Sequence, residues 1–512
     1  MPMKRMLPIV ASFALLATSA VAQDITFTPT DKTVPFSTHS FIQGDFNNDG
    51  FTDFLAVSPS LNIYGYKSDG LGGYTNWVIP TSYCPANPLA GGDFKHNGKN
   101  DLLVSTTADA SCPSGQFLDE RPIRPGTPRS ETIIARGGTF ADYLSDGRSG
   151  NFHLNSKIPI SSNAALAAVT ADFTDDHNLD AVILDGNALE LYVGDGHGGF
   201  SGPHLIATLA GSAASPTGGF YNLTVGDYDG NGCQDLAWIE AGPGTLAQIK
   251  VAYGDCHGNF VVTTPIANAI AVIDNIQTAD LDRDGVSDLL VTVDANGGGV
   301  NGPTLGIGYG EKDRTFKVKL ITDPSLTGPL AIADMNGDGY PDIAYISTSA
   351  SGAEIKILEG DATQSFAAIS TQPLPDANGV PEELLFGDYN RDGKTDLAML
   401  SAGSSNGPVF TIFTNTSAYP GGTCVAPIKP GINVCSPWLK SGTTVNILAD
   451  GTSENPAVFM ELWVDGVKRV GYGSTNELRA TLNLTPGVHR LGYWAIDAAH
   501  IKTHRVAYID VK

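Results

Sequence analysis

The chain is poor in positive charge and lacks the cysteine spacing of a zinc or redox site. It has 30 Lys and Arg against 54 Asp and Glu, a formal net charge of −24 over 512 residues. Nucleic acids and anionic membranes are recognised through Lys and Arg, so this balance argues against both as partners. Its six cysteines contain no C-x-x-C, which argues against zinc ribbons and thioredoxin-like motifs.

The first 22 residues have the three parts of a signal peptide. Lys4 and Arg5 form a positive start, an apolar stretch covers 7–17, and Ala20-Val21-Ala22 offers small residues for cleavage before Gln23. The apolar stretch is short for a membrane span, and an uncleaved anchor is the alternative. We therefore expect a secreted or cell-surface protein, and six cysteines fit an oxidising compartment.

A short acidic pattern recurs seven times along the chain. The first Asp of successive copies is separated by 48, 79, 55, 53, 54 and 54 residues. A period near 54 suits a four-stranded propeller blade, and the gap of 79 is one blade plus an insertion of about 25 residues. The copies are GDFNNDGFTDFLAV at 44–57, GDFKHNGKNDLLVS at 92–105, ADFTDDHNLDAVIL at 171–184, GDYDGNGCQDLAWI at 226–239, ADLDRDGVSDLLVT at 279–292, ADMNGDGYPDIAYI at 333–346 and GDYNRDGKTDLAML at 387–400.

The seventh copy has only three strand segments, whereas each earlier copy continues into a turn and a fourth strand. ITFTPT at 25–30 precedes the first copy and has no other partner, so we expect it to supply the missing strand. A ring closed in this way exposes no sheet edge. We predict an all-β chain: a seven-bladed β-propeller at 23–418, a Pro/Gly linker at 419–431 and an Ig-like β-sandwich at 432–512.

The acidic loops have the oxygen donors that calcium prefers. In the fullest copies the spacing is Asp-x-Asp/Asn-x-Asp-Gly-x-x-Asp, and position 7 adds a backbone carbonyl. An EF-hand is improbable because position 12 is apolar and a strand follows. Five copies keep the full set, and we expect about five calcium ions. The predicted ligands are Asp45, Asn47, Asp49, Asp53, Asp227, Asp229, Asn231, Asp235, Asp280, Asp282, Asp284, Asp288, Asp334, Asn336, Asp338, Asp342, Asp388, Asn390, Asp392 and Asp396.

Two copies depart from this pattern. The second has Lys95 at position 3, where its ammonium can replace the ion. The third has Thr174 at position 3 and His177 in place of Gly, and it keeps a weaker set. We expect no calcium in the second copy and leave the third open. The weaker set is Asp172, Asp176 and Asp180.

These seven copies resemble the FG-GAP/VCBS repeat of integrin α-subunit propellers and many bacterial surface proteins. The resemblance covers about 23–418 and implies seven blades with calcium between the first two strands of a blade. The C-terminal segment resembles bacterial Ig-like domains through its NVCSP start, its WVDGVK hairpin and PGVHRLGYWAIDAAH. Both resemblances imply a kind of domain that is typical of exported proteins.

The blade topology predicts how the cysteines pair. In an up-and-down blade, the loop after the first strand and the turn after the third lie on the same face. Cys233 is in such a loop and Cys256 in such a turn, so they should form a disulfide. On the opposite face Cys84 can pair with Cys112, which leaves Cys424 with Cys435. Each Cα–Cα distance should be about 4.4–6.8 Å.

No set of residues assembles a nucleophile, a base and an oxyanion donor. The leading hypothesis is therefore a non-catalytic binding or adhesion protein for an extracellular protein or glycan, and we expect a monomer. A polysaccharide lyase-like enzyme is the alternative. The insertion at 109–136 is either a solvated loop or, as in integrin-like propellers, part of a ligand face away from calcium. Its candidate contacts are Arg121, Arg124, Arg129 and Arg136.

Overall fold

The computed structural model describes residues 25–511 with gaps. Short gaps fall in several loops and include Asp45, Asp334 and Asp388. Among the described residues, no helix is long and apolar enough to cross a membrane. Gaps of five or more residues are 34–40, 58–62, 80–84, 96–100, 107–138, 146–151, 160–164, 210–222, 241–247, 267–272, 294–303, 375–379, 403–408 and 418–430.

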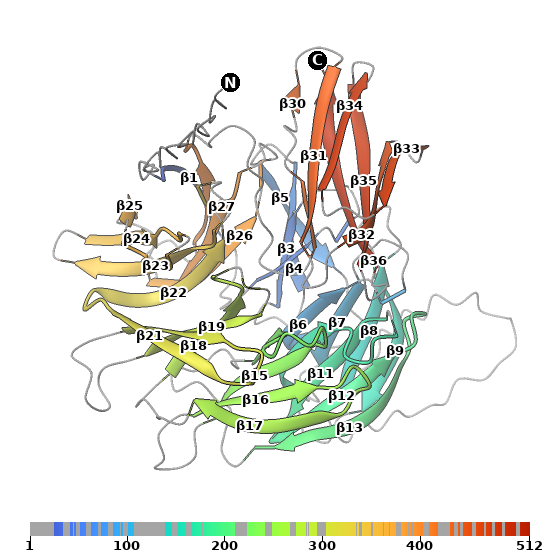
Figure 1. Cartoon of the computed structure of the whole chain (residues 1–512), viewed down its shortest axis with the longest axis vertical. Helices are drawn as coiled ribbons and strands as arrows, with labels where there is room; N and C mark the ends of the chain where they lie inside the picture. The colour runs from blue at the N-terminus through green and yellow to red at the C-terminus, as the bar shows by residue number, and fades with distance from the viewer. Residues whose placement is uncertain are drawn as a thin grey trace, which may run out of the picture.

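The described strands form a β-propeller in which four-stranded antiparallel sheets follow one another along the chain (Figure 1). We number the sheets by the acidic repeat that each contains. Sheet one has β2 (Ile42–Gly44), β3 (Asp53–Val57), β4 (Ile63–Ser68) and β5 (Tyr74–Ile79); sheet two has β6 (Pro85–Gly92), β7 (Asp101–Thr106), β8 (Thr139–Ser145) and β9 (Phe152–Pro159); sheet three has β10 (Ala165–Ala171), β11 (Asp180–Asp185), β12 (Ala188–Gly194) and β13 (Phe200–Thr208).

The later sheets repeat the same order. Sheet four has β14 (Leu223–Gly226), β15 (Asp235–Glu240), β16 (Gln248–Gly254) and β17 (Phe260–Ile266); sheet five has β18 (Ile273–Ala279), β19 (Asp288–Val293), β20 (Thr304–Gly310) and β21 (Phe316–Thr322); sheet six has β22 (Leu326–Ala333), β23 (Asp342–Ser349), β24 (Gly352–Leu358) and β25 (Ile369–Pro373); sheet seven has β26 (Val380–Gly387), β27 (Asp396–Ala402), β28 (Val409–Asn415) and β1 (Phe27–Thr33).

Burial differs between the second and fourth strands of a sheet. Every residue of β11 is buried, because both faces of this apolar run are covered. The fourth strands β13 and β21 are largely exposed or half-buried. This difference explains why the second strands read as continuous apolar runs, whereas the fourth strands carry polar residues.

The core is divided among the contacts between consecutive sheets. One cluster joins sheets three and four through Leu191 and Trp238, and another joins sheets four and five through Val251 and Leu289. Apolar burial therefore fixes each sheet against its neighbours.

The two ends of the propeller chain meet in sheet seven. β1 pairs antiparallel with β28, from Phe27 opposite Asn415 to Thr33 opposite Val409. This pairing confirms the prediction that the N-terminal segment supplies the fourth strand. Sheet seven also packs on sheet one, where the rings of Phe54 and Phe410 have centroids 4.7 Å apart.

The C-terminal strands form two further sheets. A three-stranded sheet has β29 (Gly431–Val434), β31 (Thr444–Thr452) and β34 (Glu477–Asn483). A five-stranded sheet has β30 (Leu439–Lys440), β36 (Lys502–Val511), β35 (Gly487–Asp497), β32 (Ala457–Val464) and β33 (Val467–Gly473).

Candidate functional site

The last aspartate of the acidic loop, at position 9, opens the second strand of each sheet. In all seven copies this side chain is fully buried, and Asp101 is the one in sheet two. In the other six copies its Oδ2 accepts the N–H of loop position 2. Its Oδ1 accepts the N–H of a residue at the end of the third strand or, in sheet six, two residues beyond it, and these distances are 2.7–3.2 Å. One carboxylate therefore ties the loop to the third strand. These six residues are Asp53, Asp180, Asp235, Asp288, Asp342 and Asp396.

Burial makes these carboxylates costly to ionise. It raises the pKa of Asp235 to about 8 and that of Asp288 to about 9, although the two backbone N–H bonds act in the opposite direction. Neighbouring loop carboxylates raise both pKa values further. A cation beside them would favour the charged form.

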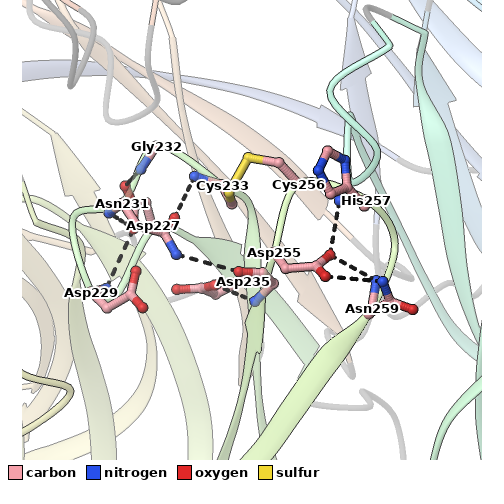
Figure 2. The surroundings of a disulfide bond; sticks show 11 residues. Asp227, Asp229, Asn231, Gly232, Cys233, Asp235, Asp255, Cys256, His257 and Asn259 are labelled. Atoms are coloured by element: carbon pink, nitrogen blue, oxygen red, sulfur yellow. Dashed lines mark hydrogen bonds between the residues drawn. A yellow bond between two sulfur atoms is a disulfide. The ribbon is translucent and has the colours of Figure 1, made fainter.

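The loop of sheet four brings three predicted ligands together. One carboxylate oxygen each from Asp227, Asp229 and Asp235 lie within 4.8 Å of one another. Asp227 accepts the backbone N–H groups of Asn231 and Gly232, at 3.1 and 2.7 Å, which curls the loop around it (Figure 2). The Asp229 side chain is 4% exposed, and its Oδ1 is buried with no hydrogen-bond partner among the described residues.

The loop of sheet five forms the second such cluster, from Asp280, Asp282 and Asp288. The N–H of Asp284 lies 3.1 Å from Asp280 Oδ1 and 3.2 Å from Asp282 Oδ1. Asp284 itself is exposed, and its Oδ1 accepts the N–H of Val286 at 2.8 Å. Both clusters offer the close, oxygen-only donor set that suits Ca²⁺.

The other predicted ligands are described only in part. Asp45, Asp49, Asp334, Asp338, Asp388 and Asp392 lie outside the described residues. Asn47, Asn336 and Asn390 are described and lie in the bends of their acidic loops. In sheet three, Asp172, Asp176 and Asp180 are not among the described groups whose oxygens converge. There Thr174 donates its hydroxyl to Asp180 Oδ2 at 3.2 Å.

A disulfide joins Cys233 to Cys256 with a Cα–Cα distance of 4.9 Å, as the blade topology predicted (Figure 2). It links the acidic loop of sheet four to the turn between β16 and β17, which lies at the same end of the sheet. Cys84, Cys112, Cys424 and Cys435 lie outside the described residues, as do Arg121, Arg124, Arg129 and Arg136.

Replacing Cys233 and Cys256 together by Ser should destabilise the chain by about 3 kcal/mol, because the bond closes a loop between residues 23 apart. Urea unfolding of the oxidised wild type and the double variant checks this. An unchanged midpoint would show that the disulfide does not restrain the unfolded chain. A non-reducing peptide map of the wild type must also contain the Cys233–Cys256 pair.

Sequence reasoning missed two residues that reach these loops from the next sheet. Arg314, in the turn between β20 and β21, lies with its Nε 2.8 Å from Asp229 Oδ2. Gln364, in the turn between β24 and β25, donates its amide to Asp282 Oδ2 at 2.9 Å. Burial raises the pKa of Asp229, and the Arg314 guanidinium partly offsets this shift. The available signal was that other copies of this turn have Gly at the same place.

Comparison with known proteins agrees with the repeat architecture. A family model described as an FG-GAP-like repeat matches residues 315–399. No curated protein sequence matches the chain.

Several solved structures are similar in fold. A lectin of Agrocybe aegerita, described for specific recognition of non-reducing terminal N-acetylglucosamine, is 12% identical over 90% of this chain and 96% of its own, with a TM-score of 0.42. The extracellular domain of a B. thetaiotaomicron one component system is 10% identical over 96% of this chain and 58% of its own, with a TM-score of 0.40. BBS1N, in complex with ARL6DN, is 9% identical over 78% of this chain and 99% of its own, with a TM-score of 0.45. These values are too low to support an argument about ligands.

Proposed function

We propose that the chain is an exported, calcium-loaded β-propeller that acts as a non-catalytic binding protein for an extracellular protein or glycan. The observation that carries the calcium part is the pair of loops in which three carboxylates converge, one of them with a buried oxygen that has no described partner. Asp227, Asp229 and Asp235 would hold one ion, and Asp280, Asp282, Asp284 and Asp288 would hold another.

Bound calcium would supply the positive charge that these carboxylates need. The chain's own residues do the rest: the position-9 aspartate holds its loop to the third strand, and the turn of the next sheet contacts the same loop. We further propose that the sheets form one closed ring of seven blades, since apolar clusters join sheet one to sheet two and sheet seven to sheet one. Such a ring is a rigid platform for recognition.

The two C-terminal sheets are proposed to form the Ig-like unit at 432–512. Their sequence alternates short strands around the hairpin formed by β32 and β33, which pair antiparallel. This unit would act as a spacer or as a second contact. The arginine-bearing insertion remains a sequence-based candidate for the ligand face.

The binding proposal is tested with protein purified from culture medium, whose N-terminus at Gln23 would check export. We expect capture of a protein from that medium or binding on a glycan array, in calcium and at reduced strength in excess chelator. Formation of unsaturated products from polyuronates would instead favour the lyase alternative. Absence of capture, glycan binding and turnover would overturn a role in recognition.

A further inference from the structure

The turn between the third and fourth strands of one sheet contacts the acidic loop of the preceding sheet. We call this turn the outer turn and number it from the glycine whose N–H binds Oδ1 of the position-9 aspartate, which is Gly194, Gly254, Gly310 or Gly360. At its fifth position, sheets three and four have Gly198 and Gly258. The N–H of Gly198 donates to Phe94 O at 3.0 Å, and that of Gly258 donates to Phe173 O at 3.2 Å. In these two sheets the fifth residue reaches the preceding loop through its backbone N–H.

Sheets five and six replace this glycine by a long polar residue. Arg314 and Gln364 have φ values of 67° and 55°, in the left-handed region that favours Gly. Their N–H groups turn back to Glu311 O and Asp361 O, at 2.8 and 2.9 Å. In these two sheets the side chain of the fifth residue makes the contact to the preceding loop. Its partner in both cases is the aspartate at loop position 3.

The two side chains bring different charges to the same position of their loops. The loop of sheet four has three aspartates at ligand positions, and the Arg314 guanidinium changes the formal charge of the group from −3 to −2. The loop of sheet five has four, and Gln364 leaves their charge at −4. Calcium affinity in such loops depends on the ligand charge count.

Arg314 is also held in place by contacts outside the loop. Its guanidinium carbon lies 4.7 Å from the centroid of the Tyr253 ring, and the Tyr253 hydroxyl donates to Arg314 O at 3.2 Å. The same loop carries the Cys233–Cys256 disulfide. Sheet four therefore has two supports for its acidic loop that need no metal.

We propose that the fifth residue of each outer turn sets the calcium affinity of the preceding loop. Arg314 acts as a built-in counter-ion that weakens calcium binding by the Asp227 loop, whereas Gln364 keeps the Asp280 loop a strong calcium site. This inference rests on the proposed calcium function. The loop of sheet four would then stay ordered when calcium is scarce, and the loop of sheet five would become ordered on binding calcium.

The test exchanges the two residues. Hydrogen–deuterium exchange across a calcium titration reads each loop through its own peptide, 227–235 or 280–288. Arg314→Gln should tighten calcium binding at 227–235 by roughly tenfold, and Gln364→Arg should weaken it at 280–288 by a similar factor. Arg314→Lys keeps the charge and should stay near wild type. Lys250→Gln is the charge control. The Lys250 amine donates to Thr264 Oγ1 away from both loops, so its loss changes the net charge as much as Arg314→Gln does and should change neither calcium affinity.

The outcomes separate the two proposals. If the calcium affinity of either loop is the same in wild type, Arg314→Gln and Gln364→Arg, this inference is overturned and the calcium function is not. Weaker binding at 227–235 in Arg314→Gln also overturns it, because Arg314 would then support the ion. If neither loop of the wild type takes up calcium, the calcium function itself fails together with the inference. Circular dichroism at saturating calcium checks that each variant is folded.

Discussion

Excess chelator will lower the melting temperature of the chain by on the order of 10 °C relative to 10 mM calcium. Calcium that binds only the folded loops stabilises them by mass action, by roughly 2.7 kcal/mol per site when its concentration is 100 times the Kd. Extracellular modules bind calcium with a Kd of about 10⁻⁴–10⁻³ M, so 10 mM calcium is about 10 to 100 times the Kd and gives up to this stabilisation. Without the ion, the three clustered carboxylates in the loops of sheets four and five repel one another.

Differential scanning calorimetry in calcium and in chelator measures this shift. Adding back excess calcium should restore the transition, whereas magnesium should restore less of it, because Mg²⁺ demands a tighter octahedral shell and keeps several waters. Melting curves that coincide in calcium and in chelator would overturn the calcium proposal.

Asp288→Ala should destabilise the chain even without calcium, by about 3 kcal/mol. The substitution removes a calcium ligand, and it also leaves the N–H groups of Leu281 and Gly310 without their acceptor at a fully buried site. Each orphaned buried N–H costs about 1–3 kcal/mol, and removal of a carboxylate that is costly to bury offsets part of this loss.

Asp284→Ala is the matched control from the same loop. Asp284 is exposed and belongs to the predicted ligand set, but it does not join the loop to β20. Its loss should remove about one calcium ion by native mass spectrometry. In chelator, the free energy of unfolding should fall by about 1 kcal/mol or less, because only the N–H of Val286 loses its acceptor. Urea unfolding of both variants, with and without calcium, makes the comparison. Equal losses for the two variants in chelator would show that the position-9 carboxylate acts only as a ligand.

Local sequence pattern was enough to locate the strands, the acidic loops and one disulfide. The apolar run after each position-9 aspartate is a strand in every described sheet, because that strand is covered on both faces and needs no polar residues. Cys233 and Cys256 could be paired because both belong to one sheet and to the same end of it. The segment at 25–30 could be assigned to sheet seven because that repeat lacked a strand.

Only the tertiary structure decided what each acidic loop meets. In the sequence, the aspartate at position 9 is one predicted ligand among several. In the structure, its two oxygens accept N–H groups from the loop and from the end of the third strand, which only the fold brings together. Arg314 and Asp229 are 85 residues apart, and Gln364 and Asp282 are 82 apart. Periodicity within one repeat describes how a sheet pairs with itself. The contact between neighbouring sheets depends on how they pack, and there a single residue in place of glycine changes the charge beside the metal loop.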